Sequence, residues 1–422
     1  MTLQAMKIAI IGTGISGLTA AYLLASEHEL TLFEAGDHIG GHTNTVPVQA
    51  SGRIHAVDTG FIVFNERNYP NFCRLLARLQ VDSQPTTMSF SVRCDQTGLE
   101  YNGTSFNHLF AQRRNLLRPR FYRMLRDILR FGRESRTNLS ETDDSITVED
   151  YIRGTGYGDW FYTKYLIPLG SALWSCPPQK FRQFPIRFVV EFLDNHAMLD
   201  VHGRPTWRVI RGGSARYVEP LTARFEDRIR LNCPVTCVRR HDSHVEVKAG
   251  PAESAEHFDE VILACHADQA LALLEDPQPA EHELLSVFPY QSNTAVLHTD
   301  TSILPRRRRA WASWNYHLRD DRPDRSTVTY NMNMLQSLPA REVYCVTLND
   351  DDGIDPARVI RRFEYHHPIY TAGRRVAQSR HHELIRKQRT SFCGAYWGFG
   401  FHEDGVNSGL AVARAFGTDL DS

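Results

Sequence analysis

The stretch KIAIIGTGISGLTAAYLLASEHELTLFEAGDHIGGHT, residues 7–43, predicts the fold of the chain. It begins with a short apolar run, residues 7–11, which is typical of a buried parallel strand. A loop of the form G-x-G-x-x-G follows at once, and a helix rich in Ala and Leu follows the loop. A strand, this loop and a helix in that order predict a βαβ unit that binds a dinucleotide.

The glycines and one acid have separate roles in such a unit. Gly12 permits the tight turn, Gly14 lets the backbone approach a pyrophosphate, and Gly17 lets the helix pack closely on the strand. A second strand ends at Glu34, whose carboxylate would accept hydrogen bonds from a ribose 2′-hydroxyl and would repel a 2′-phosphate. The predicted cofactor contacts from this unit are Gly12, Gly14, Ile15, Ser16, Gly17, Glu34 and Ala35.

Residues 35–45, AGDHIGGHTNT, add a second pair of glycines. Adjacent glycines let the backbone pass close to a ligand, and a unit that binds only NAD does not need them. The stretch resembles the continuation E-x-x-x-x-x-G-G-R of the flavin amine oxidases and related desaturases, with His42 where Arg is usual. A neutral His42 would hydrogen-bond the cofactor, and covalent attachment of the flavin is the alternative. The contacts predicted here are Gly40, Gly41, His42 and Thr43.

The C-terminal stretch GFGFHEDGVNSGLAVARAFG, residues 398–417, resembles the last turn and helix of that superfamily. The resemblance implies that the N-terminus of this helix faces the pyrimidine end of the flavin, where its partial positive charge suits the reduced ring. We expect the helix to begin near Asn407 and Ser408. The superfamily usually has an acid at the preceding strand end; here Glu403 or Asp404 would replace it, or both are ordinary loop acids. The predicted contacts are Gly405, Val406, Asn407 and Gly409.

The middle of the chain resembles the same superfamily in the order of its elements. A Gly-Gly-Ser turn and helix at 207–225 precede two alternating strands, and Val235 matches the residue that contacts adenine. We therefore expect an α/β fold with a Rossmann-type FAD-binding domain, of the glutathione-reductase-like amine oxidase topology, and an inserted α+β substrate domain. The expected FAD-binding domain comprises residues 1–85, 205–270 and 385–422, and the expected substrate domain comprises residues 86–204 and 271–384.

Longer stretches of the sequence resemble a narrower group of proteins. GGHTNTV, DTGFIVFN, YNMNMLQ and GFHEDGVNSGLA are similar to a bacterial group of predicted FAD-binding proteins. The chain also resembles the N-terminal flavin portion of plant cyclopropane fatty-acid synthases. These resemblances imply FAD as the cofactor and modified fatty-acyl chains as the substrate class.

Three residues are the predicted catalytic or substrate-facing side chains. Tyr396 and Trp397 precede the flavin helix, and aromatic walls can exclude water and orient a reacting C–H bond. His402 is a candidate base. The alternative for each is packing in the core. The lysines lie in no recognisable flavin-facing motif, which argues against ordinary amine oxidation.

Three functions follow as hypotheses. The first is an FAD-dependent oxidoreductase that takes hydride from a carbon of a fatty-acyl or lipid substrate to flavin N5. The second is a flavin amine or amino-acid oxidase acting on a small molecule. The third is a flavin-bearing partner of a lipid methyltransferase.

Charge and composition bound the partners. The formal net charge is −1, so nothing global favours nucleic acid. The eight cysteines form no metal-binding pattern, and we expect reduced thiols and no metal site. Without a cationic leader or a long apolar run we expect a cytoplasmic protein. Residues 112–136 combine nine arginines with apolar residues at helical spacing, which indicates either peripheral contact with the inner membrane or a helix packed in the core.

Overall fold

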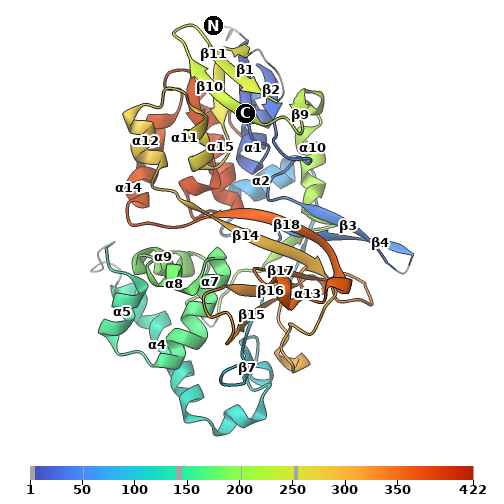
Figure 1. The fold of residues 1–422 in the computed structure, drawn as a ribbon, viewed down its shortest axis with the longest axis vertical. Coiled ribbons are helices and arrows are strands. Elements are labelled where there is room, and N and C mark those ends of the chain that lie inside the picture. The colour runs from blue at the N-terminus through green and yellow to red at the C-terminus, as the bar shows by residue number, and fades with distance from the viewer. Residues whose placement is uncertain (1–4, 51, 139–144, 201, 251–254, 422) are drawn as a thin grey trace.

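The chain folds into two halves that stack along the long axis of the molecule (Figure 1). The computed structural model describes residues 5–50, 52–138, 145–200, 202–250 and 255–421. One half contains a five-stranded parallel sheet and is called the parallel-sheet half; the other contains a seven-stranded mixed sheet and is called the mixed-sheet half. Strands β14 (Tyr290–His298) and β18 (Val359–Pro368) run across the middle between them.

The parallel sheet is assembled from strands that lie far apart in the sequence. Its order is β19-β13-β1-β2-β9, and all neighbouring strands are parallel. The N-terminal, middle and C-terminal segments all contribute strands, which gives the α/β fold expected from the sequence. The bounds are β1 Lys7–Ile11, β2 Glu29–Phe33, β9 Ile229–Arg230, β13 Glu260–Leu263 and β19 Thr390–Phe392.

Alternation along the buried strands places apolar side chains in two cores. Ile8 and Ile10 face one side of the parallel sheet, while Ala9 and Ile11 face the other. Helices α1, α2, α10 and α15 cover the first side, and helices α11, α12 and α14 with the small sheet β10-β11-β12 cover the second. The bounds are α1 Ile15–Leu24, α2 Pro70–Arg78, α10 Val218–Thr222, α11 Ala267–Leu273, α12 Pro279–Leu285, α14 Arg374–Ser379, α15 His402–Ala415, β10 Val235–Arg240, β11 Val245–Ala249 and β12 Glu256–Phe258.

The mixed-sheet half consists of its sheet and a layer of helices. The strand order is β18-β14-β17-β16-β15-β6-β7, and only β15 and β6 pair in parallel among the described strands of this sheet. The helices beside it enclose an aromatic core that includes Phe161 and Trp174. The bounds are β6 Phe90–Cys94, β7 Leu99–Asn102, β15 Trp314–Leu318, β16 Thr327–Asn331, β17 Cys345–Leu348, α4 Pro119–Asn138, α5 Val148–Thr155, α7 Ile167–Trp174 and α9 Ile186–Asn195.

Several elements pack on the half that their position in the sequence does not suggest. Helices α12 and α14 come from residues 271–384 but pack under the parallel sheet. Strands β3 (Thr45–Ala50) and β4 (Arg53–Asp58) come from the N-terminal segment but pack in the core of the mixed-sheet half. The reason is the pair of strands β14 and β18, which we call the crossing ribbon. Strand β14 begins and strand β18 ends beside the parallel sheet, so α12, which precedes β14, and α14, which follows β18, stay there.

The arginine-rich segment divides into two pieces. Residues Arg113–Leu117 form a 3-10 turn, and α4 begins at Pro119. The apolar face of α4 packs inward, because Phe121 and Met124 lie in one core and Phe131 lies in another. This face is therefore not available to a membrane. Within the described part of the chain, no helix is both long enough and apolar enough to cross a bilayer.

Candidate cofactor site at the carboxyl edge of the parallel sheet

The first glycine loop follows β1 at the carboxyl edge of the sheet. Gly12 has φ +106°, a left-handed conformation that favours glycine. A Cβ atom at Gly12 would lie 2.8 Å from the carbonyl oxygen of Ala264, and one at Gly17 would lie 2.2 Å from the carbonyl oxygen of Gly12. The start of α1 is thus held against the strands, as the glycine spacing predicts.

Gly14 differs from its neighbours because it faces open space. A Cβ atom there would meet no atom of the described residues within 4 Å. Gly41 folds onto this loop, and a Cβ atom on it would lie 3.2 Å from the Cα atom of Gly14. The N–H of Gly40 donates to the carbonyl of Thr13 at 3.1 Å. The two glycine pairs therefore form a backbone-lined cradle at the N-terminus of α1, which suits a pyrophosphate.

Glu34 is held in place at the end of β2. Its carboxylate accepts a hydrogen bond from the backbone N–H of Thr13 at 3.0 Å and another from the Thr13 hydroxyl at 2.5 Å. The second oxygen accepts from the N–H of Gly36 at 2.8 Å. Thr13 is a residue that the glycine motif alone does not identify. Its hydroxyl fixes the acid beside the cradle, where a ribose would follow the pyrophosphate.

The last helix reaches the same edge, as expected, but it starts earlier than expected. Helix α15 begins at His402 rather than near Asn407 and Ser408, and the carboxylate of Asp404 accepts the N–H of Phe401 at 2.9 Å. This bond closes a cap that the sequence pattern did not reveal. A Cβ atom at Gly405 would lie 2.5 Å from the side chain of Ile15.

The glycines of α15 thus bring α15 into close contact with α1. A Cβ atom at Gly409 would lie 2.5 Å from the carbonyl oxygen of Ser16, and Val406 is fully buried in the core. Asn407 accepts a hydrogen bond from the side chain of Asn71 at 2.8 Å. The structure gives these four residues packing contacts, and their contact with a cofactor stays a prediction.

Glu403 is used elsewhere. Its carboxylate accepts hydrogen bonds from the backbone N–H groups of Asn71 at 3.0 Å and Phe72 at 2.9 Å. These N–H groups lie in the first turn of α2, where they have no hydrogen-bond partner within the helix. Burial raises the pKa of Glu403 to about 7. The structure therefore assigns Glu403 to capping α2, and Asp404 to capping α15, rather than to a ribityl chain.

The sequence pattern of the family described as flavin containing amine oxidoreductase matches residues 15–348. The chain belongs to this family. It is therefore an FAD-dependent oxidoreductase, and the glycine cradle beside Glu34 is the predicted site of its FAD.

Solved structures of the same fold cover almost the whole flavin amine oxidoreductase chain. Cyclohexylamine oxidase from Brevibacterium oxydans is 16% identical, with a TM-score of 0.70 over 97% of this chain and 98% of that one. The CLA-producing fatty acid isomerase from P. acnes is also 16% identical, with a TM-score of 0.68 over 99% of this chain and 100% of that one. These likenesses confirm the fold class.

A curated relative is similar over a much shorter stretch. The 4,4'-diapophytoene desaturase (4,4'-diaponeurosporene-forming) of Staphylococcus aureus is 52% identical over 40 residues, which is 9% of this chain and 8% of the desaturase. This match spans less than a tenth of either protein.

The residues of the cradle fit FAD. The open position at Gly14, the glycine pair folded onto it and the fixed Glu34 carboxylate would hold the pyrophosphate and a ribose. Val235 starts β10, and the N–H of the nearby Cys233 donates to the backbone oxygen of Glu34 at 2.8 Å; the contact of Val235 with adenine stays a prediction. When bound, FAD supplies the acceptor for a hydride, which carries two electrons.

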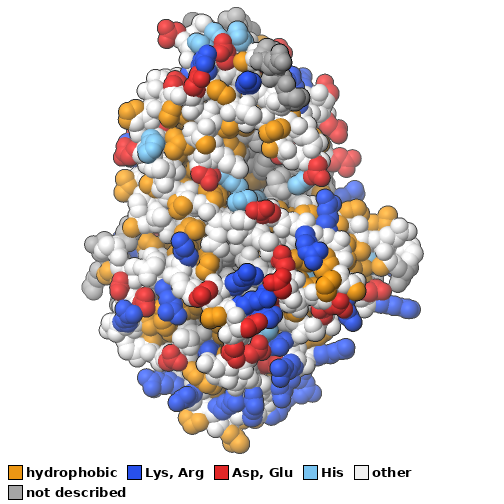
Figure 2. All heavy atoms as spheres, viewed as in Figure 1, with side chains coloured by type: hydrophobic (Ala, Val, Ile, Leu, Met, Phe, Trp, Pro, Cys, Tyr) orange, Lys and Arg blue, Asp and Glu red, His pale blue; other side chains and the backbone are white. Residues whose placement is uncertain are grey.

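Four histidines and two tyrosines gather beside the cradle. The ring of His42 stacks on Tyr365 of β18, with 5.0 Å between centroids, and lies 5.3 Å from His367. His266 follows β13, stacks on Tyr290 of β14 at 4.3 Å and lies 6.0 Å from His366. Figure 2 shows histidine side chains beside a hollow at the level where the two halves meet. The crossing ribbon β14–β18 therefore brings histidines to the FAD edge.

His42, His266 and His367 are neutral near pH 7. Burial lowers the pKa of His42 and of His266 to about 4, and it lowers the pKa of His367 to about 3. The Nε2 atom of His42 is enclosed and has no hydrogen-bond partner among the described residues. A neutral ring with a free nitrogen can hydrogen-bond FAD, as the sequence led us to expect; covalent attachment stays a prediction.

The three predicted catalytic side chains lie in packed surroundings. The ring centroids of Tyr396 and Trp397 lie 5.1 and 5.6 Å from that of Phe288, in the core under the parallel sheet. The Nε2 atom of His402 lies 2.8 Å from the Tyr217 hydroxyl, and its ring stacks on Phe61. Burial lowers the pKa of His402 well below its ordinary value, so it is a weak base. Core packing is the better supported alternative for all three, and their catalytic role stays a prediction.

Other aromatic residues from the same segment face the mixed-sheet half. Phe399 stacks on Phe188, with 5.5 Å between ring centroids, and Phe401 stacks on Phe192, with 5.0 Å between centroids. Phe188 and Phe192 both belong to α9. Trp397 ends the 3-10 turn Ala395–Trp397 and packs in the core under the parallel sheet, whereas Phe399 and Phe401 follow that turn and pack in the core of the mixed-sheet half.

A buried arginine lies among these rings, and sequence reasoning missed it. The guanidinium carbon of Arg374 lies 3.9 Å from the ring centroids of both Phe188 and Tyr370. Its Nη2 atom donates to the carbonyl of Gly398 at 2.5 Å. Burial lowers the pKa of Arg374 to about 10, which leaves it charged at pH 7. No motif marks this residue, because its partners come from three distant parts of the chain.

Proposed function

We propose that this FAD-dependent oxidoreductase oxidises the acyl chain of a lipid that it takes from an anionic membrane. In this proposal the chain's own residues hold the cofactor at the glycine cradle and exclude water with aromatic side chains. Amine oxidation is the alternative.

The observation that carries the proposal is a surface at the far end of the mixed-sheet half. We call it the arginine tip and define it as residues 104–126 together with 306–309. Phe106 is 72% exposed and Leu117 is 87% exposed. Of the nine large hydrophobic side chains exposed among the described residues, four lie in the tip; they are Phe106, Leu116, Leu117 and Tyr122.

The apolar residues of the tip form one patch. Phe106 and Tyr122 both lie against the ring of Phe110, at 4.7 and 6.0 Å, and the Tyr122 hydroxyl donates to the carbonyl of Leu116 at 3.0 Å. Side chains that are both exposed and clustered in this way are typical of a surface that enters a membrane interface or contacts a partner.

The charges around the patch match an anionic bilayer. Residues 104–126 contain six arginines and neither Asp nor Glu, and residues 306–309 add four arginines. Arg113, Arg114 and Arg118 donate to carbonyl or amide oxygens rather than to carboxylates in the described structure. Figure 2 shows Lys and Arg gathered around this end of the molecule. Arg123 and Arg126 pair with Asp127, and Arg307 pairs with Glu100. Each of the other cations adds about 1 kcal/mol of attraction near an anionic membrane surface.

Arg374 supports a lipid over an amine. Its charge is fixed among Phe188, Tyr370 and the backbone of Gly398. A positive charge in the aromatic cluster would repel the ammonium group of an amine substrate, whereas an apolar chain carries no charge to be repelled.

The comparisons support both candidates. Two similar proteins are a diapophytoene desaturase and a fatty acid isomerase by name, which favours a hydrocarbon chain. The resemblance to the flavin portion of plant cyclopropane fatty-acid synthases points the same way and adds a lipid methyltransferase as a possible partner. The family's own description and cyclohexylamine oxidase favour an amine.

Anaerobic reduction of the bound flavin distinguishes the candidates. The flavin absorbance near 450 nm should bleach when vesicles carrying methyl-branched, cyclopropanated or unsaturated phospholipids are added. It should not bleach with putrescine, cyclohexylamine or amino acids. Bleaching with amines alone would overturn the lipid proposal. Bleaching with neither, together with stable binding to a lipid methyltransferase, would favour the partner function.

Vesicle sedimentation tests the membrane surface separately. The protein should sediment with vesicles containing phosphatidylglycerol, and 0.5 M NaCl should weaken the binding. Leu117→Asp should lower the affinity of the protein for these vesicles at least about tenfold. Val376→Asp is the matched control, because Val376 is also an exposed apolar residue, at 62%, but lies in the parallel-sheet half. Equal losses in both variants would contradict a specific tip.

A further inference from the structure

A cluster of histidines lies on the small sheet β10-β11-β12, apart from the FAD cradle. His241 and His244 flank the turn between β10 and β11, Glu246 lies in β11 and His257 lies in β12. In Figure 1 these strands stand at the end of the parallel-sheet half that is far from the crossing ribbon. The cluster therefore belongs neither to the cofactor site nor to the arginine tip.

Strand pairing turns these side chains to the outer face of the small sheet. Val245 and Val247 point into the core, so Glu246 between them points outward. Glu246 pairs directly with His257 of β12. The backbone N–H of His241 donates to the carbonyl of His244 at 2.9 Å, which closes the turn and brings the two imidazoles to the same place.

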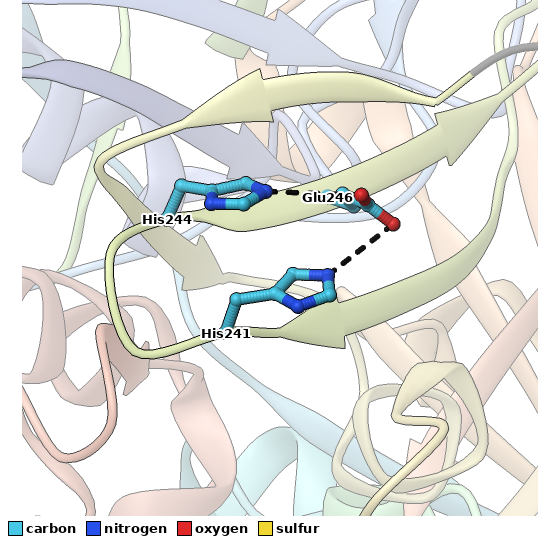
Figure 3. Close-up of side chains that lie close together, drawn as sticks. All are labelled: His241, His244 and Glu246. Carbon is cyan, nitrogen blue, oxygen red and sulfur yellow. Dashed lines mark ion pairs between the residues drawn. The ribbon is translucent and has the colours of Figure 1, made fainter.

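Three nitrogens converge on one carboxylate. The Nε2 atom of His241 lies 3.4 Å from one oxygen of Glu246, and the Nε2 atom of His244 lies 3.7 Å from the other (Figure 3). The Nε2 atom of His257 lies 3.5 Å from that second oxygen. The ligand atoms of His241, His244 and Glu246 all lie within 4.8 Å of one another.

These separations suit a metal better than hydrogen bonds. Typical N–H···O bonds measure about 2.9 Å. Ligands on a tetrahedral zinc ion, with bonds of about 2.0–2.1 Å, lie about 3.4 Å apart. Imidazole nitrogen with one carboxylate is a donor set that zinc accepts and that magnesium and calcium do not favour.

The surroundings orient the ligands. The Nδ1 atom of His244 lies 3.1 Å from the Ser243 hydroxyl, which leaves Nε2 as the atom that faces Glu246. That Nε2 atom is enclosed and makes no hydrogen bond within the described residues. The carbonyl of Asp242 in the turn accepts two hydrogen bonds from Arg389, at 3.0 and 2.9 Å, so the turn is fixed from outside.

One nearby cation does not fill the site. The Arg239 guanidinium approaches Glu246 to 4.0 Å, but its Nε and Nη2 atoms are hydrogen-bonded to Glu275.

We propose that His241, His244 and Glu246 bind one zinc ion, with water or His257 at the fourth position. The ion would join the β10–β11 turn to β12 on the outside of the small sheet. From the sequence we expected no metal site, because the cysteines form no metal-binding pattern. The three ligands lie within one hairpin, residues 241–246, and its turn brings their ligand atoms together.

Zinc binding to the FAD-loaded protein tests this proposal without using activity. After EDTA treatment and gel filtration, calorimetry with zinc chloride should show one site of micromolar or tighter affinity whose occupation is lost in His244→Gln and in Glu246→Gln. Elemental analysis after a second gel filtration should show one fewer zinc per chain in both variants. A tenfold excess of magnesium should not compete.

A matched control separates this site from other surface histidines. His282 is exposed on α12, away from the cluster, and His282→Gln should bind zinc as the unaltered protein does. Flavin absorbance and circular dichroism report whether each variant is folded. Unchanged zinc binding in a folded His244→Gln or Glu246→Gln variant, or no zinc retained by the unaltered protein, would overturn the proposal.

Discussion

The glycine loop at residues 12–17 and the arginine tip differ in how tightly the rest of the chain holds them. In the loop, a single added methyl group at Gly17 would lie 2.2 Å from a backbone oxygen. In the tip, Phe106 and Leu117 expose most of their surface. The loop is determined by packing inside the chain, because neighbouring backbones leave no space. The exposed side chains of the tip have few neighbours within the chain, so we expect their composition to reflect a surface outside it that covers them.

The largest expected effect is at Gly17. Gly17→Ala forces the Cβ atom against the carbonyl of Gly12 and the side chain of Ala264, so the start of α1 must move. We expect a loss of about 3 kcal/mol in the free energy of unfolding, from overpacking, and no bound FAD. Urea unfolding and the flavin absorbance of the purified protein measure both.

Gly14→Ala is the control for that variant. An added Cβ atom at Gly14 meets no described residue, so the free energy of unfolding of the apoprotein should change by less than about 0.5 kcal/mol. FAD affinity should still fall, because the methyl group would occupy the cradle. Equal destabilisation by the two variants would show that Gly14 is packed like Gly17.

The next effect is at the joint between the halves. Buried Asp58 accepts hydrogen bonds from Thr45 at 2.6 Å, from the Ser214 hydroxyl at 2.9 Å and from Gln336 at 2.9 Å. Asp58→Ala leaves these donors without a partner and should cost about 3 kcal/mol. Thermal unfolding measures the loss. The exposed Asp37, replaced by Ala, should change stability by no more than about 0.5 kcal/mol.

Acid should lower the folding stability by a smaller net amount than Asp58→Ala does. Buried histidines have folded pKa values near 4, below the ordinary value of 6.5, so the unfolded chain binds more protons between about pH 4 and 6.5. Stability from these groups is present at pH 7 and is lost as the pH falls through that range. The histidines lowered to about 3 or 4 are His42, His196, His266, His298, His367 and His381.

Three buried carboxyls act in the opposite direction. Burial raises the pKa of Asp58 and of Asp404 to about 6, and that of Glu403 to about 7, so the folded state takes up these protons first and gains stability as the pH falls from about 7 to 4. Because the histidines are more numerous, we expect a lower melting temperature at pH 4.5 than at pH 7. A higher melting temperature at pH 4.5 would mean that the carboxyls dominate.

The smallest effect on stability is at the tip. Leu117→Ala removes a side chain that is 87% exposed, so the free energy of unfolding should stay within about 0.5 kcal/mol of the unaltered value. Leu18→Ala, at a fully buried position in α1, is the comparison and should cost about 2–5 kcal/mol, that is, at least about four times as much. A costly Leu117→Ala would show that the tip is packed within the chain rather than left for a membrane.

Local patterns anticipated the cofactor site where the chemistry lies within one short stretch. The turn at Gly12, the acid at Glu34 and the second glycine pair all follow from spacing, because each acts through its own backbone or through a neighbouring strand end. The start of α15 was misplaced because the acids at its first turn looked like loop residues. One caps α15 and the other caps α2, and a cap of a distant helix leaves no trace in the local pattern.

The sequence by itself predicted the α/β class, the flavin oxidoreductase family and a glycine cradle at the carboxyl edge of the sheet, because strand, loop and helix propensities are local. Only the tertiary structure decided which side chains surround that edge and which surfaces remain outside. The Arg374 guanidinium among aromatic rings and the histidines of β18 beside His42 each join residues from separate strands or helices. Such sites depend on register and crossing, which distant contacts set.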